Sequence, residues 1–269
     1  GYTMVYGIAK MLNFAHGDII MVGSYVVYIA VSSLGLNPIL SVVISAIVCL
    51  VLGVVIEKVA YKPLRHASKL AVLITAIGVS YFLQNMALLI FGANTKSFTS
   101  VVPAVSVQLG GITITAETIV TIVACIVIMI CLTLFINKTK AGHAMQAVSE
   151  DQDAAQLMGI NVNATISLTF AIGSALAAVA GVLLCSAYPS LTPYTGAMPG
   201  IKAFVAAVFG GIGSIPGALI GGILLGVIEI LSKAYISSQL SDAIVFGVLI
   251  VVLVVKPTGI LGKVIQEKV

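Results

Sequence analysis

Charged side chains are scarce in this sequence. Asp, Glu, Lys and Arg make up only 8% of its 269 residues, 60% are hydrophobic, and the mean hydropathy is +1.19. Soluble globular domains typically carry about 25% charged residues. So few charges could not cover the surface of a soluble domain of this length. The composition therefore excludes a soluble protein and predicts a surface that faces lipid.

Basic clusters and metal-ligand patterns are also missing from the sequence. The net charge is only +4, and no Lys/Arg cluster with interleaved aromatic residues occurs, so we expect no nucleic-acid partner. No cysteine belongs to a CxxC pair or to a Cys/His cluster at metal-binding spacing, so we expect no metal site and interpret the cysteines as small buried hydrophobes. The four cysteines are Cys49, Cys125, Cys131 and Cys185.

Two patterns typical of membrane proteins that convert energy do not occur either. There is no G-x-x-x-x-G-K-[ST] loop, so the chain does not bind ATP through a Walker site. There is no series of intramembrane carboxylates or arginines of the kind expected in a proton-coupled pump. Any driving force would have to come from another subunit.

The apolar residues that fill the chain fall into long runs, and a membrane-spanning helix needs about 20 of them. We expect an all-α, polytopic transmembrane bundle of about seven or eight spans, forming one membrane domain over residues 1–269. Residues 1–7 resemble the middle of an apolar segment, so we expect a helix to precede them. The candidate spans are 19–36, 39–56, 70–91, 118–136, 165–187, 201–211, 215–231 and 243–255, after a partial segment at 1–12.

Lysine and arginine in the loops predict the orientation of the chain. We expect loop 58–69, loop 137–163 and the C-terminal tail on the cytoplasmic side. Loop 92–117 has one lysine with turn and strand formers, so we expect it outside. The sequence leaves open whether 201–211 crosses the membrane or re-enters. The basic residues used are Lys58, Lys62, Arg65 and Lys69, then Lys138 and Lys140, then Lys256, Lys263 and Lys268.

The longest polar insert, 137–163, carries three of the nine acidic residues. Ser149 and Gln152 have the spacing of a capping box, and the acids Glu150 and Asp151 favour a helix N-terminus. Gly159 suits a left-handed helix end. The pattern predicts a helix of about two and a half turns over 150–158, with Ser149 as its N-cap.

The apolar residues of this helix need a partner. They either pack on the cytoplasmic ends of the chain's own spans or dock on a soluble subunit, and we favour docking. We expect a bulky charged residue at Ala155 to break this docking, and with it the function of the protein, while membrane insertion stays intact. The apolar residues concerned are Ala154, Ala155, Leu157 and Met158.

Residues 153–159, Asp-Ala-Ala-Gln-Leu-Met-Gly, resemble the EAA-x-x-x-G motif of ABC importer permeases, in which this loop forms the coupling helix that sits in a groove of the ATPase subunit. Asp153 replaces the Glu of the motif, and Ile-Ser-Leu-Thr at 166–169 stands where the family has I-x-L-P. Further segments are similar to the branched-chain amino-acid permeases of that family. They are 1–7, 12–18, 147–162, 209–218 and 256–262.

The resemblance implies a multi-pass inner-membrane permease subunit of the vitamin B12 and ribose permease type, which moves branched-chain amino acids. It also implies a second homologous permease, two ATPase subunits that bind the ATP, and a periplasmic or lipoprotein substrate-binding protein. The chain itself would be a transport subunit without cofactor or enzymatic activity. The expected coupling residues are Ser149, Glu150, Asp151, Asp153, Ala154, Ala155, Leu157, Met158 and Gly159.

Two groups of residues are candidates for the translocation pathway or its gate. Asn13, His16 and Asp18 are polar in an apolar region, and His16 could pair with Asp18. They form either a structural hydrogen-bond network or part of the pathway. Gly213, Ser214 and Pro216 belong to a glycine-rich stretch that indicates either tight helix packing or a broken helix beside the pathway.

The glycine-rich stretch contains two GxxxG spacings, 213–217 and 222–226, which we expect to be helix-packing motifs. For the charges near the span ends we expect an i,i+4 pair between Glu229 and Lys233, positions at helix N-termini for Glu117 and Asp242, and a Lys202 side chain that reaches toward the membrane interface.

Other functions stay open at this point. A secondary transporter with inverted repeats would need a repeat and ion ligands, and neither is visible. An intramembrane serine protease using Ser214 would need a histidine beside it, and only His16 lies near a span. Within the resembling family, urea, short amides or other amino acids could also be the substrate.

Overall fold

The computed structural model describes residues 1–65, 67–102, 105–109 and 112–262, and Lys263 and Lys268 of the basic tail lie outside this part. Within it the chain is mainly helical, as predicted. The helices are α1 (Tyr2–Ala9), α2 (His16–Ser32), α3 (Pro38–Ile56), η1 (Glu57–Tyr61), η2 (Lys62–Leu64), α4 (Lys69–Phe91), α5 (Ala116–Lys138), α6 (Lys140–Glu150), α7 (Gln152–Leu157), α8 (Val162–Ala187), α9 (Ala197–Gly210), α10 (Ile215–Tyr235) and α11 (Ser241–Val255).

Within the described ranges, five helices are long and apolar enough to cross a membrane, and three further apolar helices are shorter. The expected count of seven or eight spans is therefore not confirmed. The long helices cover Pro38–Leu64, Leu70–Phe91, Ala116–Lys138, Val162–Ala187 and Ile215–Tyr235, and the shorter ones cover His16–Ser32, Ala197–Gly210 and Ser241–Val255.

The predicted boundary between the first two spans is wrong by a few residues. The helix α2 starts at His16 and ends at Ser32, because Gly35 takes a left-handed backbone (φ 61°). Asn37 then caps α3 by accepting a hydrogen bond from the Ile39 amide at 2.9 Å, with Pro38 in the first turn.

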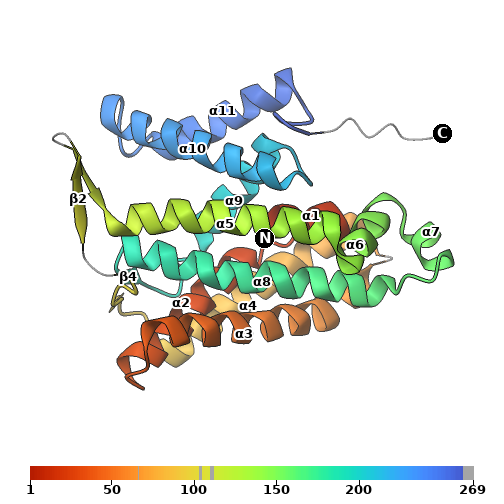
Figure 1. Ribbon diagram of the computed structural model, residues 1–269, viewed down its shortest axis with the longest axis horizontal. Coiled ribbons are helices and arrows are strands. Elements are labelled where there is room, and N and C mark those ends of the chain that lie inside the picture. The colour runs from red at the N-terminus through yellow and green to blue at the C-terminus, as the bar shows by residue number, and fades with distance from the viewer. Residues whose placement is uncertain (66, 103–104, 110–111, 263–269) are drawn as a thin grey trace.

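The helix α8 lies at the centre of the bundle. It contacts α1, α2, α3, α5 and α6, and it buries Phe170 and Ile166 completely. A separate apolar cluster joins α9, α10 and α11 around Val205, Phe209 and Leu225. In Figure 1, α10 and α11 accordingly form a layer beside the main bundle.

The two ends of the bundle differ in structure. At one end lie short strands: β1 (Lys96–Ser97) pairs antiparallel with β4 (Ser190–Leu191), and β2 (Ser106–Leu109) pairs antiparallel with β3 (Ile112–Thr115). The helices α6 and α7 lie at the other end (Figure 1). The strand formers of loop 92–117 and the polar insert 137–163 therefore sit at opposite ends of the molecule.

Between Glu117 in its first turn and Lys138 in its last, α5 is mainly apolar, and none of its residues is buried. Cys125 and Cys131 on this helix are exposed, whereas Cys49 and Cys185 are buried. The interpretation of all four cysteines as buried is thus wrong for two of them. In a membrane an apolar, exposed helix face is where lipid contacts the protein, so a cysteine there needs no protein partner.

Candidate functional site

The polar insert folds into two helices rather than the single one predicted. The first, α6, follows α5 through a sharp turn, in which the Thr139 hydroxyl accepts from the Gly142 amide at 3.0 Å. A side chain at Gly142 would lie 2.4 Å from the backbone of Ile136, so the turn requires glycine. The helix buries Met145 and Val148 against the bundle, which fixes it to the membrane domain.

The second helix, α7, is capped by Asp151 and not by Ser149. A carboxylate oxygen of Asp151 accepts from the amides of Asp153 (2.9 Å) and Ala154 (3.0 Å). Ser149 lies inside α6, where its hydroxyl donates to the carbonyl of Gln146 at 2.7 Å. The capping-box prediction is therefore wrong. Asp caps as well as Ser does, and its negative charge also favours the helix N-terminus.

The end of α7 was predicted correctly. Gly159 has φ 83°, its amide donates to the carbonyl of Gln156, and the Ile160 amide donates to the carbonyl of Ala155, each at 3.0 Å. These two bonds form a Schellman motif, which closes the helix through a left-handed glycine. The connection from α7 to α8 is consequently short and well defined.

The apolar side chains of α7 divide into two groups. Ala155 is only 4% exposed and belongs to the main apolar core, so a bulky charged residue there would disturb the chain's own packing. Leu157 is 89% exposed and Met158 82%, and Ala154 is also exposed. The acids Glu150, Asp151 and Asp153, at the start of α7, are exposed as well. The tip of α7 thus presents two bare apolar side chains within a polar end of the molecule.

The polar residues near the start of the chain do not form one site. Asp18 is 1% exposed and accepts hydrogen bonds from Gln84 (2.9 Å) and Ser80, which both lie on α4. The expected pair between Asp18 and His16 is wrong, because residues two apart on a helix point in different directions. His16 instead packs edge-on against Tyr2, with ring centroids 5.6 Å apart.

Asn13 has a third environment, at the connection between α1 and α2. Its side-chain oxygen accepts a hydrogen bond of 2.9 Å from the Tyr61 hydroxyl, and both residues are buried. Asn13 and Asp18 thus serve as hydrogen-bond partners between elements. A role for Asn13, His16 or Asp18 in the pathway stays a prediction.

The residues Gly213, Ser214 and Pro216 lie at a break between α9 and α10. Ser214 caps α10 by accepting from the Gly217 amide at 3.1 Å, Pro216 stands in the first turn, and Gly213 has φ 87°. Gly213 therefore lies in a turn before α10 begins. The prediction that the 213–217 spacing is a helix-packing motif is wrong. A pathway role for the break stays a prediction.

The close helix contact involves other glycines. A side chain at Gly217 would lie 2.5 Å from the carbonyl oxygen of Gly210, and one at Gly221 would lie 2.3 Å from that of Ala206. Gly226, in contrast, faces open space. The packing motif of α10 is thus the pair 217 and 221, against α9.

An ion-pair cluster joins the last three helices. The predicted pair between Glu229 and Lys233 is present, and Glu117 and Asp242 lie in first helical turns as predicted. Lys202, however, contacts both Glu229 and Asp242 at 2.8 Å, where only a reach to the interface was predicted. Opposite charges on otherwise apolar helices could have indicated this contact, since such charges pair when they can.

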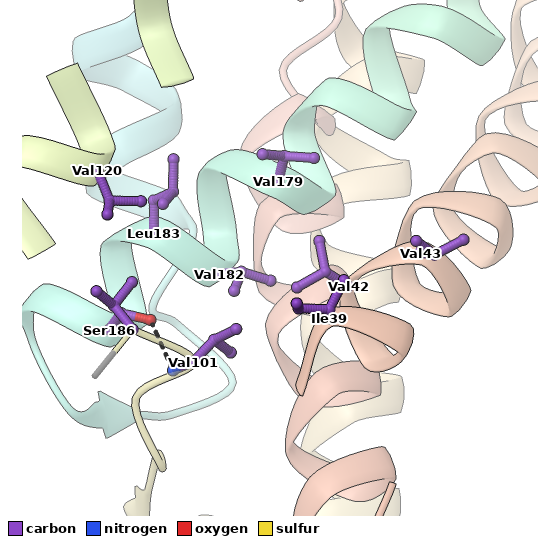
Figure 2. Close-up of a pocket in the computed structure, with 10 residues that line it drawn as sticks. Ile39, Val42, Val43, Val101, Val120, Val179, Val182, Leu183 and Ser186 are labelled. Carbon is purple, nitrogen blue, oxygen red and sulfur yellow. Dashed lines mark hydrogen bonds between the residues drawn. The ribbon is translucent and has the colours of Figure 1, made fainter. Parts of the chain in front are cut away.

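An apolar groove lies between α3, α5 and α8 (Figure 2). Its volume is about 260 Å³, and Ser186, the one polar side chain among the described residues that line it, accepts a hydrogen bond from the Val101 amide. The described lining residues offer the ammonium and carboxylate groups of an amino acid no charged partner, so this lining does not suit a zwitterionic ligand. Val42, Val120 and Val182 are among its lining residues.

Comparison with known proteins assigns this architecture to a family. Residues 1–253 match the family model described as branched-chain amino acid transport system / permease component. The chain belongs to this family. It is therefore a permease component, with relatives that are named as transport proteins.

The relatives extend over nearly the whole chain. It is 46% identical to the high-affinity branched-chain amino acid transport system permease protein BraD of Pseudomonas aeruginosa, over 100% of this chain and 92% of BraD. It is 45% identical to LivH of Escherichia coli K12, over 100% of this chain and 91% of LivH. A probable LivH of Methanocaldococcus jannaschii is 31% identical, over 97% and 86%. No solved structure matches the chain.

Proposed function

We propose that this permease component is one membrane subunit of an ATP-driven importer for branched-chain amino acids, and that α7 is the element that docks on an ATPase subunit. The observation that carries the docking proposal is the exposure of Leu157 (89%) and Met158 (82%) at the tip of α7. Two bare apolar side chains in an otherwise polar segment suit a protein contact.

The arrangement of the loops supports an orientation for this proposal. An arginine of loop 58–69, Arg65, hydrogen-bonds Asn163 at the start of α8, so this loop lies beside the end of the polar insert. Basic loops of membrane proteins favour the cytoplasm. The end that carries α6 and α7 would thus face the cytoplasm, where an ATPase could reach it, and the strands would face outward.

The remaining partners are proposed from the same family membership. A second homologous permease would complete the translocation pathway, two ATPase subunits would bind and hydrolyse the ATP, and a substrate-binding protein would deliver the amino acid on the outer side. The permease itself would then carry neither a cofactor nor an enzymatic site. The relatives BraD and LivH are named for branched-chain amino acids, which supports leucine, isoleucine and valine as substrates.

Uptake into liposomes tests this function. The full-length tagged protein would be reconstituted with the partners that purify with it, and uptake of labelled leucine would be measured with the binding protein present. We expect uptake that requires ATP on the ATPase side and is competed by isoleucine and valine. Uptake without ATP would instead indicate a secondary transporter. Competition by urea or a short amide, but not by isoleucine, would refute the substrate assignment.

A further inference from the structure

A completely buried carboxylate lies where α3 ends. Glu57 is the first residue of η1, a turn of π-helix between α3 and the basic loop, and it is 0% exposed. Single π-helical turns inside helices are rare and frequently lie at functional positions. A buried carboxylate must be paired and hydrogen-bonded, or its loss of hydration is not offset. The hydrogen-bond partners of Glu57 therefore show which segments of the chain this π-helical turn connects.

Each carboxylate oxygen of Glu57 accepts a hydrogen bond. One donor lies eight residues further along the chain, and the other lies on α8. One oxygen accepts from the Arg65 guanidinium, whose side chain is 10% exposed, and forms an ion pair with it. The other accepts a hydrogen bond of 2.6 Å from the Ser167 hydroxyl on α8. The carboxylate thus fastens the loop after α3 to α8.

Arg65 makes a second contact with its other terminal nitrogen. This nitrogen donates to the side-chain oxygen of Asn163, which is the second residue of α8 and is exposed. A guanidinium can bridge two acceptors in this way because it presents its donors in a rigid, planar fork. Arg65 therefore clamps the first turn of α8 to the buried Glu57.

The clamp lies next to α7 along the chain. The helix α7 ends at Leu157, the Schellman bonds close it at Gly159, and Asn161 caps α8 by accepting from the Ala164 amide at 3.0 Å. These hydrogen bonds restrict the backbone conformation of the connection between α7 and α8. A displacement of α7 would be passed to the first turn of α8, which is where Arg65 binds.

The same turn of π-helix is attached on its other side to the start of the bundle. Tyr61, its last residue, donates to Asn13 at 2.9 Å and packs against Phe170 of α8 with ring centroids 5.2 Å apart. The segment 57–65 thus contacts α8 and the connection between α1 and α2. Because the segment continues directly from α3, it links α3 to α8, and the two helices can move together.

We propose that Glu57 and Arg65 are positioning residues that transmit movement of α7 to α3 and to the α1–α2 connection during transport. This rests on the proposed function, since it assumes that an ATPase moves α7. The ion pair would make α8 and the 57–65 segment move together, so that ATP hydrolysis is converted into rearrangement of the spans. Without the pair, a smaller part of a movement of α7 would reach α3 and the α1–α2 connection, because only the packing of α8 and the Ser167 hydrogen bond would still transmit it.

The test measures substrate molecules imported per ATP hydrolysed, in liposomes that hold the complete complex. The variants are Asn163→Ala, which removes the acceptor at an exposed position, Asn163→Asp, which keeps an acceptor, and Arg65→Lys, which keeps the charge but loses the fork. Lys233→Ala serves as the matched control, because it removes an exposed polar contact on α10, which lies in the layer beside the main bundle and away from α7 (Figure 1). Amounts of assembled complex are measured for every variant.

We expect Asn163→Ala and Arg65→Lys to assemble and hydrolyse ATP while the import per ATP falls by between about twofold and about thirtyfold. Asn163→Asp and Lys233→Ala should keep the parental ratio. A parental ratio in Asn163→Ala and Arg65→Lys would overturn the proposal, and so would an equal fall in Asn163→Asp. A role in folding alone would lower the amount of complex and leave the ratio unchanged. If the parent protein itself imports without ATP, the proposed function fails, and not the clamp.

Discussion

The side-chain amide of Gln84 donates a hydrogen bond of 2.9 Å to the carboxylate of Asp18, which joins two helices, α4 and α2, inside the bundle. Asp18 is 1% exposed, and its other oxygen accepts from Ser80. The acid is therefore fully used in holding the two helices together. If the Gln84 amide is removed, a buried carboxylate oxygen of Asp18 is left without its hydrogen-bond donor.

Replacing Gln84 with leucine should accordingly destabilise the protein. Removing one partner of a buried polar contact costs about 1–3 kcal/mol. The measurement is thermal unfolding in detergent. Asn85→Leu is the control, because Asn85 is the next residue and is exposed. Equal unfolding temperatures for Gln84→Leu and Asn85→Leu would show that the contact does not stabilise the bundle.

The close approach of α9 and α10 predicts different effects for two glycines of one helix. Gly217→Ala should destabilise the protein, because its side chain would lie 2.5 Å from the carbonyl oxygen of Gly210. Gly226→Ala should be neutral or stabilising by up to about 1 kcal/mol, since Gly226 faces open space and alanine favours helix. Unfolding in detergent measures both. A larger loss for Gly226→Ala than for Gly217→Ala would contradict the packing described here.

The cap of α7 gives a prediction that separates Asp151 from Ser149. Asp151→Ala should loosen α7 by about 0.5–2 kcal/mol, the usual cost of losing an N-cap. Ser149→Ala should have little effect on α7, because the Ser149 hydroxyl bonds within α6. Hydrogen exchange of the Asp153 and Ala154 amides reports the local opening. Faster exchange in Ser149→Ala, with Asp151→Ala unchanged, would restore the capping box predicted from the sequence.

The ion-pair cluster of the last helices should contribute modestly to stability. Lys202→Met leaves Asp242 without its cation, and we expect a loss of about 1 kcal/mol, because the groups are partly exposed. Lys233→Met removes only the i,i+4 contact and should cost about 0.3–0.5 kcal/mol. Unfolding at low and at high salt checks this, since screening should shrink both losses. Losses that grow with salt would contradict an electrostatic origin.

The sequence predicted most of what depends on local chemistry. Helices in apolar runs, the left-handed end at Gly159 and the Glu229–Lys233 pair all follow from residues close together in the chain. Family membership was predicted from the segments around 12–18, 147–162 and 209–218, and the match over residues 1–253 confirms it.

The sequence could not predict contacts between distant segments. Asp18 binds residues 62 and 66 positions away, and Ser167 binds Glu57 across 110 positions, so no spacing reveals either contact. The cap of α7 was missed for another reason. Ser149 and Asp151 are both good N-caps, and the choice between them depended on α6, which was not predicted.

Purification of the complex from membranes tests the central claim most directly. The tagged full-length protein would be isolated in mild detergent beside a Leu157→Glu/Met158→Glu variant, and co-purified proteins would be identified by mass spectrometry. Tyr235→Glu, a change of another side chain that is 83% exposed, at the far end of α10, is the control. We predict that an ATPase and a second permease accompany the parent and Tyr235→Glu, and that the double variant keeps the permease but loses the ATPase. A parent that purifies alone and still transports in liposomes, or a double variant that retains the ATPase, would contradict the account.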